Sequence, residues 1–126
     1  MIELKPAHFP GRAPIDAYGR GGFRFAEMSH RGSLLCLPSG IYSWEPANVL
    51  DLGKRDLELV LKEAAEIEIL LIGSGMEQRL ISPDLRAIFR EHGISVDTMT
   101  TGAAVRTFNV LLAEDRAIAA AFVAVE

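Results

Sequence analysis

The chain contains 126 residues, of which 49% are hydrophobic, and its formal net charge is −4 at pH 7. This length corresponds to one domain that can bury its own core, and the hydrophobic fraction excludes an intrinsically disordered chain. No apolar run approaches the roughly 20 residues of a membrane-spanning helix, and the N-terminal residues lack the uninterrupted apolar segment of a secretory signal. We therefore expect a single domain over residues 1–126 with no integral membrane segment.

Charge is distributed unevenly along the chain. Residues 1–33 carry five basic and three acidic side chains, whereas the remaining residues carry eight basic and fourteen acidic ones. Nucleic-acid binding requires a cluster of cations that displaces phosphate counterions. Five cations spread over an acidic protein do not form such a cluster, so we expect no nucleic-acid partner.

Residues 1–46 hold five of the six prolines and several short runs of strand-forming residues. Two strands are predicted at residues 15–18 and 23–25, joined by a glycine-rich turn. Two further strands are predicted at residues 33–37 and 41–44. Together they indicate a small antiparallel sheet or ribbon.

Helices and strands alternate after residue 51. The spacing of apolar residues predicts a helix near residues 57–65, then a buried strand at residues 67–72. A second helix is predicted to begin at Ser82 and Pro83 and to end before Gly93. The residues expected to form the buried faces of these two helices are Leu57, Val60, Leu61, Ala64, Ala65, Leu85, Ile88 and Phe89.

The last third of the chain continues the same alternation. A strand is predicted at residues 94–99, followed by a third helix that Thr100 or Thr101 caps. The nearly continuous apolar segment at residues 118–125 predicts an inner strand covered on both faces, of open orientation. The side chains of the third helix that are expected to face the core are Ala104, Val105, Phe108, Leu111 and Leu112.

These elements predict an α/β fold with three layers. Helices that connect successive strands favour right-handed crossovers between parallel strands. We therefore expect a central mixed, mostly parallel sheet that is flanked by helices, with an N-terminal β-rich ribbon that extends or covers it. Residues 67–72, 94–98 and 118–124 are expected to be strands of one sheet.

The segment Gly73-Ser74-Gly75 follows a predicted buried strand, and Asp97 lies 22 residues beyond Gly75. This spacing is similar to a dinucleotide-binding turn, but Gln78 occupies the position of the third glycine. The next helix is also predicted to begin only near Pro83, too late for its amides to meet a pyrophosphate. The segment is therefore expected to be a loop that ends a strand.

The remaining residue patterns do not indicate catalysis. His8, His30 and His92 are too far apart in sequence for the spacings typical of metal ligands. Cys36, the one cysteine, excludes an intramolecular disulfide, and its apolar neighbours predict a buried thiol. We predict no catalytic residue, no metal site and no cofactor.

The segment from Thr100 to Asn109 places hydroxyl groups and free amides at a helix N-terminus, at the edge of the sheet where strands end. Ligands of open α/β sheets bind outside these strand ends. The alternative is a capped helix with small packing residues and either a surface Arg106 or an Arg106 paired with a buried carboxylate such as Asp97. The candidate binding residues are Gly73, Ser74, Gly75, Asp97, Thr101, Arg106 and Asn109.

Several blocks of the sequence resemble one small single-domain family, long described as a domain of unknown function, that includes mitochondrial respiratory complex I assembly factor 3 and an adipogenesis-associated cytosolic protein. The most specific block is residues 101–111, in which many relatives carry a cysteine where this chain has Val105, so thiol chemistry there is not essential to this chain. The other blocks are residues 69–75, 82–86, 93–97 and 114–121, and the similarity extends to Tyr18-Gly19 and Trp44-Glu45-Pro46.

The resemblance implies a three-layer fold with a central mixed sheet, a role in protein contact, and no established enzyme activity or cofactor. Because the chain lacks the targeting extension of a mitochondrial member, we expect a bacterial cytoplasmic protein. The first functional hypothesis is a non-enzymatic binding module whose partners are respiratory complex subunits or assembly factors. The second is a small-molecule or anion-binding protein, or a cryptic enzyme, with a pocket at the edge of the sheet where the strands end.

Overall fold

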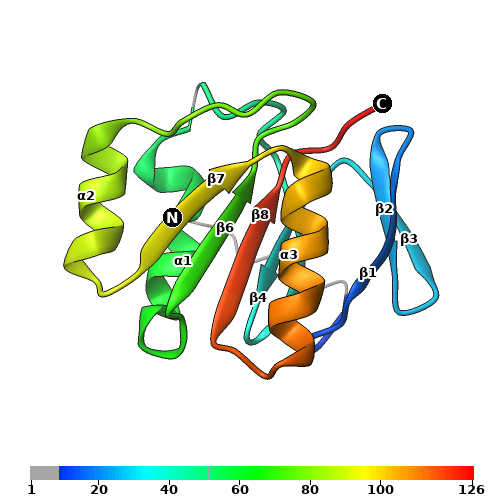
Figure 1. Ribbon diagram of the computed structural model, residues 1–126, viewed down its shortest axis with the longest axis horizontal. Coiled ribbons are helices and arrows are strands. Elements are labelled where there is room, and N and C mark those ends of the chain that lie inside the picture. The colour runs from blue at the N-terminus through cyan, green and yellow to red at the C-terminus, as the bar shows by residue number, and fades with distance from the viewer. Residues whose placement is uncertain (1–8, 51) are drawn as a thin grey trace.

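The computed structural model describes residues 9–50 and 52–126, which form two β-sheets and three α-helices (Figure 1). The α/β class and the mixed main sheet are as predicted from the sequence. The two sheets divide the predicted N-terminal ribbon, because its first strands form a separate sheet and its later strands join the main one.

The first sheet is antiparallel and contains β1 (Ile15–Gly19), β2 (Gly22–Phe25) and β3 (Met28–Arg31). Both hairpins close through two residues with positive φ, which are Arg20 and Gly21 in the first and Ala26 and Glu27 in the second. This turn geometry matches the twist of the strands it joins. Strand β3 was not predicted, since Ser29, His30 and Arg31 are not strong strand formers.

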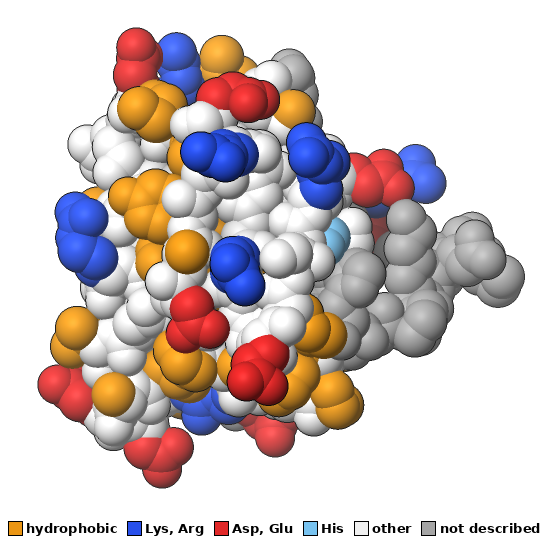
Figure 2. Space-filling model, turned by 90° about the vertical axis from the view of Figure 1, so that its right-hand side faces the viewer, with side chains coloured by type: hydrophobic (Ala, Val, Ile, Leu, Met, Phe, Trp, Pro, Cys, Tyr) orange, Lys and Arg blue, Asp and Glu red, His pale blue; other side chains and the backbone are white. Residues whose placement is uncertain are grey.

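One face of this three-stranded sheet is covered and the other is open. Phe23 and Phe25 are buried against the rest of the molecule, whereas Arg24 between them is exposed, as the alternation of a half-buried strand requires. Figure 2 views this side of the molecule, where several Lys and Arg side chains lie at separate positions on the surface.

The main sheet has five strands in the order β5-β4-β8-β6-β7. They are β4 (Ser33–Leu37), β5 (Gly40–Trp44), β6 (Ile69–Gly73), β7 (Ser95–Met99) and β8 (Ile118–Phe122). Strands β8, β6 and β7 are parallel, whereas β4 pairs antiparallel with both β5 and β8. The expected predominance of parallel pairing is therefore wrong for the half of the sheet that the N-terminal strands supply.

Three helices lie on the main sheet, namely α1 (Glu58–Lys62), α2 (Pro83–Glu91) and α3 (Thr101–Ala113). The helix predicted near residues 57–65 is shorter than expected, because α1 is flanked by the 3₁₀ turns η1 (Lys54–Leu57) and η2 (Ala64–Glu66). Leu57 and Val60 are fully buried, but Ala65 is exposed, so its predicted place on the buried face is wrong. Alanine methyl groups bury too little apolar area to hold a further α-helical turn on the sheet.

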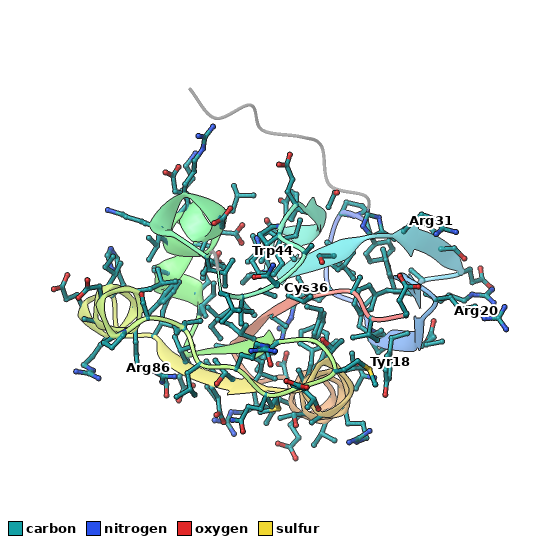
Figure 3. All side chains as sticks on the ribbon, turned by 90° about the horizontal axis from the view of Figure 1, so that it is seen from above. Tyr18, Arg20, Arg31, Cys36, Trp44 and Arg86 are labelled. Atoms are coloured by element: carbon teal, nitrogen blue, oxygen red, sulfur yellow. The ribbon has the colours of Figure 1, made fainter. Side chains whose placement is uncertain are left out.

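Side chains of the main sheet alternate between two hydrophobic cores. Leu35 and Leu37 of β4 face the core beneath α1 and α2, whereas Leu34 and Cys36 face the core beneath α3 and the three-stranded sheet. The view from above shows α1 and α3 on opposite faces of the sheet (Figure 3). Strand β8 lies at the centre, and its five residues are at most 2% exposed, as predicted for an inner strand covered on both faces.

Candidate functional site

The carboxyl ends of β6 and β7 meet the beginning of α3 at one edge of the main sheet. Strand β6 ends at Gly73, β7 ends at Met99, and Thr100 caps α3 by accepting a hydrogen bond from the Ala103 amide at 3.3 Å. Directly beyond β6, the amide of Ser74 donates to the carbonyl of Met99 at 2.8 Å. The structure therefore brings together four of the sequence-derived candidates, which are Gly73, Ser74, Gly75 and Thr101.

Thr101 is fully buried and connects three segments. Its hydroxyl donates to the carbonyl of Val123 at 2.7 Å and accepts the amide of Gly75 at 2.9 Å. Its own amide donates to the carbonyl of Gly75, also at 2.9 Å. Thr101 therefore holds the loop after β6 and the end of the chain against α3.

Ser74 organises the loop that follows β6. Its hydroxyl donates to the carbonyl of Glu77 at 2.7 Å, lies 3.1 Å from the carbonyl of Met99, and accepts the amide of Arg79 at 3.0 Å. A serine nucleophile requires a base that takes its proton. Here the Ser74 hydroxyl is already hydrogen-bonded to backbone groups. Its role is therefore to hold the loop in place.

The loop fixed by Ser74 presents two large apolar side chains to solvent. Met76 is 77% exposed and Leu80 is 68% exposed. Between them, the side-chain amide of Gln78 donates to the carbonyl of Thr98 at 2.9 Å. At this edge of the sheet, the apolar side chains of Met76 and Leu80 are therefore exposed, whereas the side-chain amide of Gln78 is hydrogen-bonded to the backbone.

Asn109 performs a structural function that its position on the third helix did not indicate. Its side-chain oxygen accepts the amide of Ile15 and its side-chain nitrogen donates to the carbonyl of Ile15, both at 2.9 Å. These two bonds attach β1 to α3 across 94 residues of sequence. The side-chain amide of Asn109 therefore attaches the three-stranded sheet to α3.

Arg106 and Asp97 are both exposed, on α3 and on β7 respectively. Among residues 9–50 and 52–126, no ion pair joins Arg106 to Asp97 or to another carboxylate. This geometry agrees with a surface arginine and differs from the alternative of a buried pair.

Tyr18 is a neighbour of α3 that was not among the candidate binding residues. An added Cβ at Gly102 would collide with the Tyr18 hydroxyl, so the tyrosine ring lies directly over the first turn of the helix. Tyr18 is nevertheless 43% exposed, and Figure 3 shows it at the end of the molecule that carries the three-stranded sheet. Because Gly102 and Tyr18 are 84 residues apart, no local pattern could have indicated this contact.

Cys36 and the histidines are placed as structural residues. The Cys36 thiol is 2% exposed, and burial raises its pKa far above the usual range. A ring nitrogen of His30 lies 3.0 Å from the carbonyl of Ser33, and Nδ1 of His92 lies 2.8 Å from the carbonyl of Ile88. In the described part of the chain, no group of three or more His, Cys, Asp or Glu residues could hold a metal ion; His8 lies outside that part.

A family model of a protein of unknown function, DUF498/DUF598, matches residues 15–123. The chain belongs to this family. The match includes both sheets, all three helices and each sequence-derived candidate residue. It confirms the resemblance identified from residues 69–75 and 101–111.

Relatives of this DUF498/DUF598 chain include bacterial and animal proteins. An uncharacterized protein of Rhodobacter capsulatus is 34% identical over 96% of this chain and 91% of its own length. NADH dehydrogenase [ubiquinone] 1 alpha subcomplex assembly factor 3 of Mus musculus is 29% identical over 97% of this chain but only 66% of its own length. The chain therefore spans about two thirds of that animal relative.

The fold of this family is also present in solved structures. A crystal structure described as an outer membrane protein from Bartonella henselae is 60% identical to this chain, with a TM-score of 0.91, and the match covers 94% of this chain and all of that one. Among the residues described here, no helix is both long and apolar enough to cross a membrane.

Proposed function

We propose that the chain is a non-enzymatic binding module that acts by protein contact, in the manner of a respiratory complex I assembly factor. The family relationship supports this role, because its animal relatives are named as assembly factors of NADH dehydrogenase. The geometry of the strand ends supports it as well. A ligand pocket there would need free polar groups, whereas the hydroxyls of Ser74 and Thr101 are bonded to the backbone.

The contact surface that we propose is the outer side of α3, defined by Tyr18, Arg106 and Val110. Tyr18 covers the first turn of the helix, and Arg106 and Val110 follow on the next two turns. Tyr18 and Val110 are 43% and 57% exposed, which leaves apolar area available to a partner on either side of the guanidinium. Tyrosine and arginine are enriched among the residues that dominate protein interfaces.

The observation that carries this proposal is Arg106 itself. Its neighbour Val105 is 4% exposed, which fixes the rotation of α3 and directs residue 106 to solvent. Because no carboxylate of the described residues pairs with Arg106, its planar guanidinium group is available to bind a carboxylate of the partner. The partners that we propose are subunits or assembly factors of a respiratory complex in the bacterial cytoplasm.

The test is the variant Arg106→Ala, compared with Arg55→Ala, which removes an exposed arginine from η1. We expect both variants to melt within a few degrees of the wild type, since surface substitutions change stability by about 0.5 kcal/mol or less. From fractionated cells, tagged wild type and Arg55→Ala should retain NADH dehydrogenase subunits from the cytoplasmic fraction, whereas Arg106→Ala should lose most of them. Equal retention by all three proteins, or no enrichment of such subunits by the wild type, would contradict the proposal.

A further inference from the structure

A second surface feature lies at the beginning of β7, away from the strand ends and from α3. An open surface cavity of about 340 Å³ lies beside α2 and the beginning of β7 and is lined by Arg86, Arg90, Gly93, Ile94, Ser95 and Val96. Cavities of this size accommodate small organic ligands. Figure 3 shows Arg86 at the opposite end of the molecule from Tyr18, so this cavity is separate from the proposed protein contact surface.

The two arginines of the cavity are oriented by the packing of α2. Leu85 and Phe89 are at most 3% exposed, and each precedes one of the arginines, so Arg86 and Arg90 follow on one side of the helix, a turn apart. A terminal nitrogen of Arg86 donates to the carbonyl of Val96 at 2.9 Å. This bond holds the guanidinium against β7 and leaves its other N–H groups for a ligand.

The cavity lining carries no negative charge that pairs with these two cations. The lining residues include no Asp or Glu, and within residues 9–50 and 52–126 neither Arg86 nor Arg90 takes part in an ion pair. Two like charges one helical turn apart repel each other. An anion between them would remove that repulsion.

One backbone acceptor on the strand side of the cavity, the carbonyl of Val96, already has a donor. Strand β7 forms one edge of the sheet, and its alternate residues direct their backbone groups away from β6. On this edge, the carbonyl of Val96 accepts Arg86 and that of Thr98 accepts Gln78, both at 2.9 Å. The carbonyl of Val96 therefore faces the Arg86 guanidinium and is not free to repel an anion in the cavity.

Carbonyl groups at the C-terminal end of α2 also accept backbone hydrogen bonds. The carbonyl of Phe89 accepts the amide of Ile94 at 2.9 Å, and that of Arg90 accepts the amide of Gly93 at 3.0 Å. Gly93 has a φ of +76°, the left-handed conformation that permits this closure. Two of the carbonyl oxygens that contribute to the negative potential of the helix C-terminus are thus hydrogen-bonded.

We propose that the cavity between α2 and β7 is a binding site for a small ligand with anionic oxygens, such as a phosphate or carboxylate group. Arg86 is held in place before the ligand arrives, and the exposed Arg90, one turn further along α2, supplies the second guanidinium. Guanidinium groups bind both oxyanions through two parallel hydrogen bonds. This site goes beyond the proposed protein contact, since it lies on different elements and uses different residues.

The experiment is an amide NMR titration of the full chain with inorganic phosphate and, separately, with citrate, at an ionic strength kept constant with sodium chloride. We expect saturable shifts at the amides of Gly93, Ser95 and Val96 with at least one of the two probes. Saturation by phosphate alone assigns a phosphate group to the ligand, and saturation by citrate alone assigns a carboxylate.

Two variants separate a built site from general attraction of anions. Arg90→Ala should weaken binding by about tenfold or more because it removes a charged group that donates two parallel hydrogen bonds. Arg55→Ala should bind the anion as the wild type does. Arg90→Lys keeps the positive charge but lacks the planar guanidinium group, so its affinity for the anion should lie between those of the wild type and Arg90→Ala. Shifts that do not saturate with either probe, or binding that Arg90→Ala leaves unchanged, would overturn the proposal, and neither result bears on the Arg106 surface.

Discussion

The thiol of Cys36 lies in the core between the main sheet and α3, where 2% of the residue is exposed. Burial disfavours the charged thiolate and raises its pKa. The folded pKa is therefore above the unfolded value of about 8.5. The contribution of this group to stability is complete below that pH and decreases as the pH rises above it, because only the unfolded chain then loses the proton.

We predict that the native chain does not react with a thiol reagent such as Ellman's reagent at pH 8, and that it reacts with one equivalent after denaturation. A chain with one cysteine makes this measurement unambiguous, and Cys36→Ala provides the blank. Rapid reaction of the native protein would place the thiol at the surface and contradict its burial.

Asn109 and Thr101 show what a sequence reveals about single residues and what it does not. Thr101 was chosen because polar groups at the start of a helix beside strand ends are typical of ligand sites, and Asn109 because it lies one turn from Arg106 on the same polar face of that helix. The structure uses them as clasps to Ile15 and Val123, which are 94 and 22 residues away. The residue types and their helix were predictable, but their bonding partners depend on how distant segments meet.

At the scale of elements, α2 was well predicted because its own residues mark both of its ends. Ser82 caps α2 by accepting the amide of Leu85 at 3.2 Å, Pro83 occupies the first turn, and Gly93 ends the helix with positive φ. Strand β3 carries no comparable signal and exists because β2 pairs with it. Elements fixed by their own residues were predictable, and elements fixed by a neighbour were not.

The contact between β6 and α3 depends on Gly73. A Cβ at this position would lie 3.0 Å from Cα of Thr101 and 3.2 Å from both the Ala104 methyl and the Phe122 ring. The backbone of α3 cannot yield as a flexible side chain could, so a methyl group here would push the helix away from the sheet.

We predict that Gly73→Ala lowers the free energy of unfolding by about 1–3 kcal/mol, the usual cost of overpacking, as measured by urea denaturation. The matched control is Gly53→Ala, where an added Cβ meets no atom within 4 Å and φ is −122°. That variant should be unchanged or gain up to about 1 kcal/mol, because alanine restricts the unfolded chain. Equal stabilities of the two variants would mean that α3 and β6 are not in close contact.

For the whole molecule, the central strands couple the two cores. Trp44 belongs to the core beneath α1 and α2, where its indole donates to the carbonyl of Asp56 at 2.7 Å. Phe108 belongs to the core on the opposite face, where it meets Phe122 of β8 edge to face with ring centroids 5.6 Å apart. Since successive residues of β8 contribute to both cores, neither core can lose its packing while the other keeps it.

We therefore predict that Phe108→Ala shifts the unfolding transition recorded by Trp44 fluorescence as much as the transition recorded by far-ultraviolet circular dichroism. Truncation of a buried phenylalanine costs about 3–5 kcal/mol, so the shift should be large with both probes. Val110→Ala, on the same helix but 57% exposed in the wild type, should leave both transitions within about 0.5 kcal/mol. A circular dichroism transition that moves while the Trp44 transition stays in place would show that the two faces unfold independently, in conflict with a sheet whose inner strand belongs to both cores.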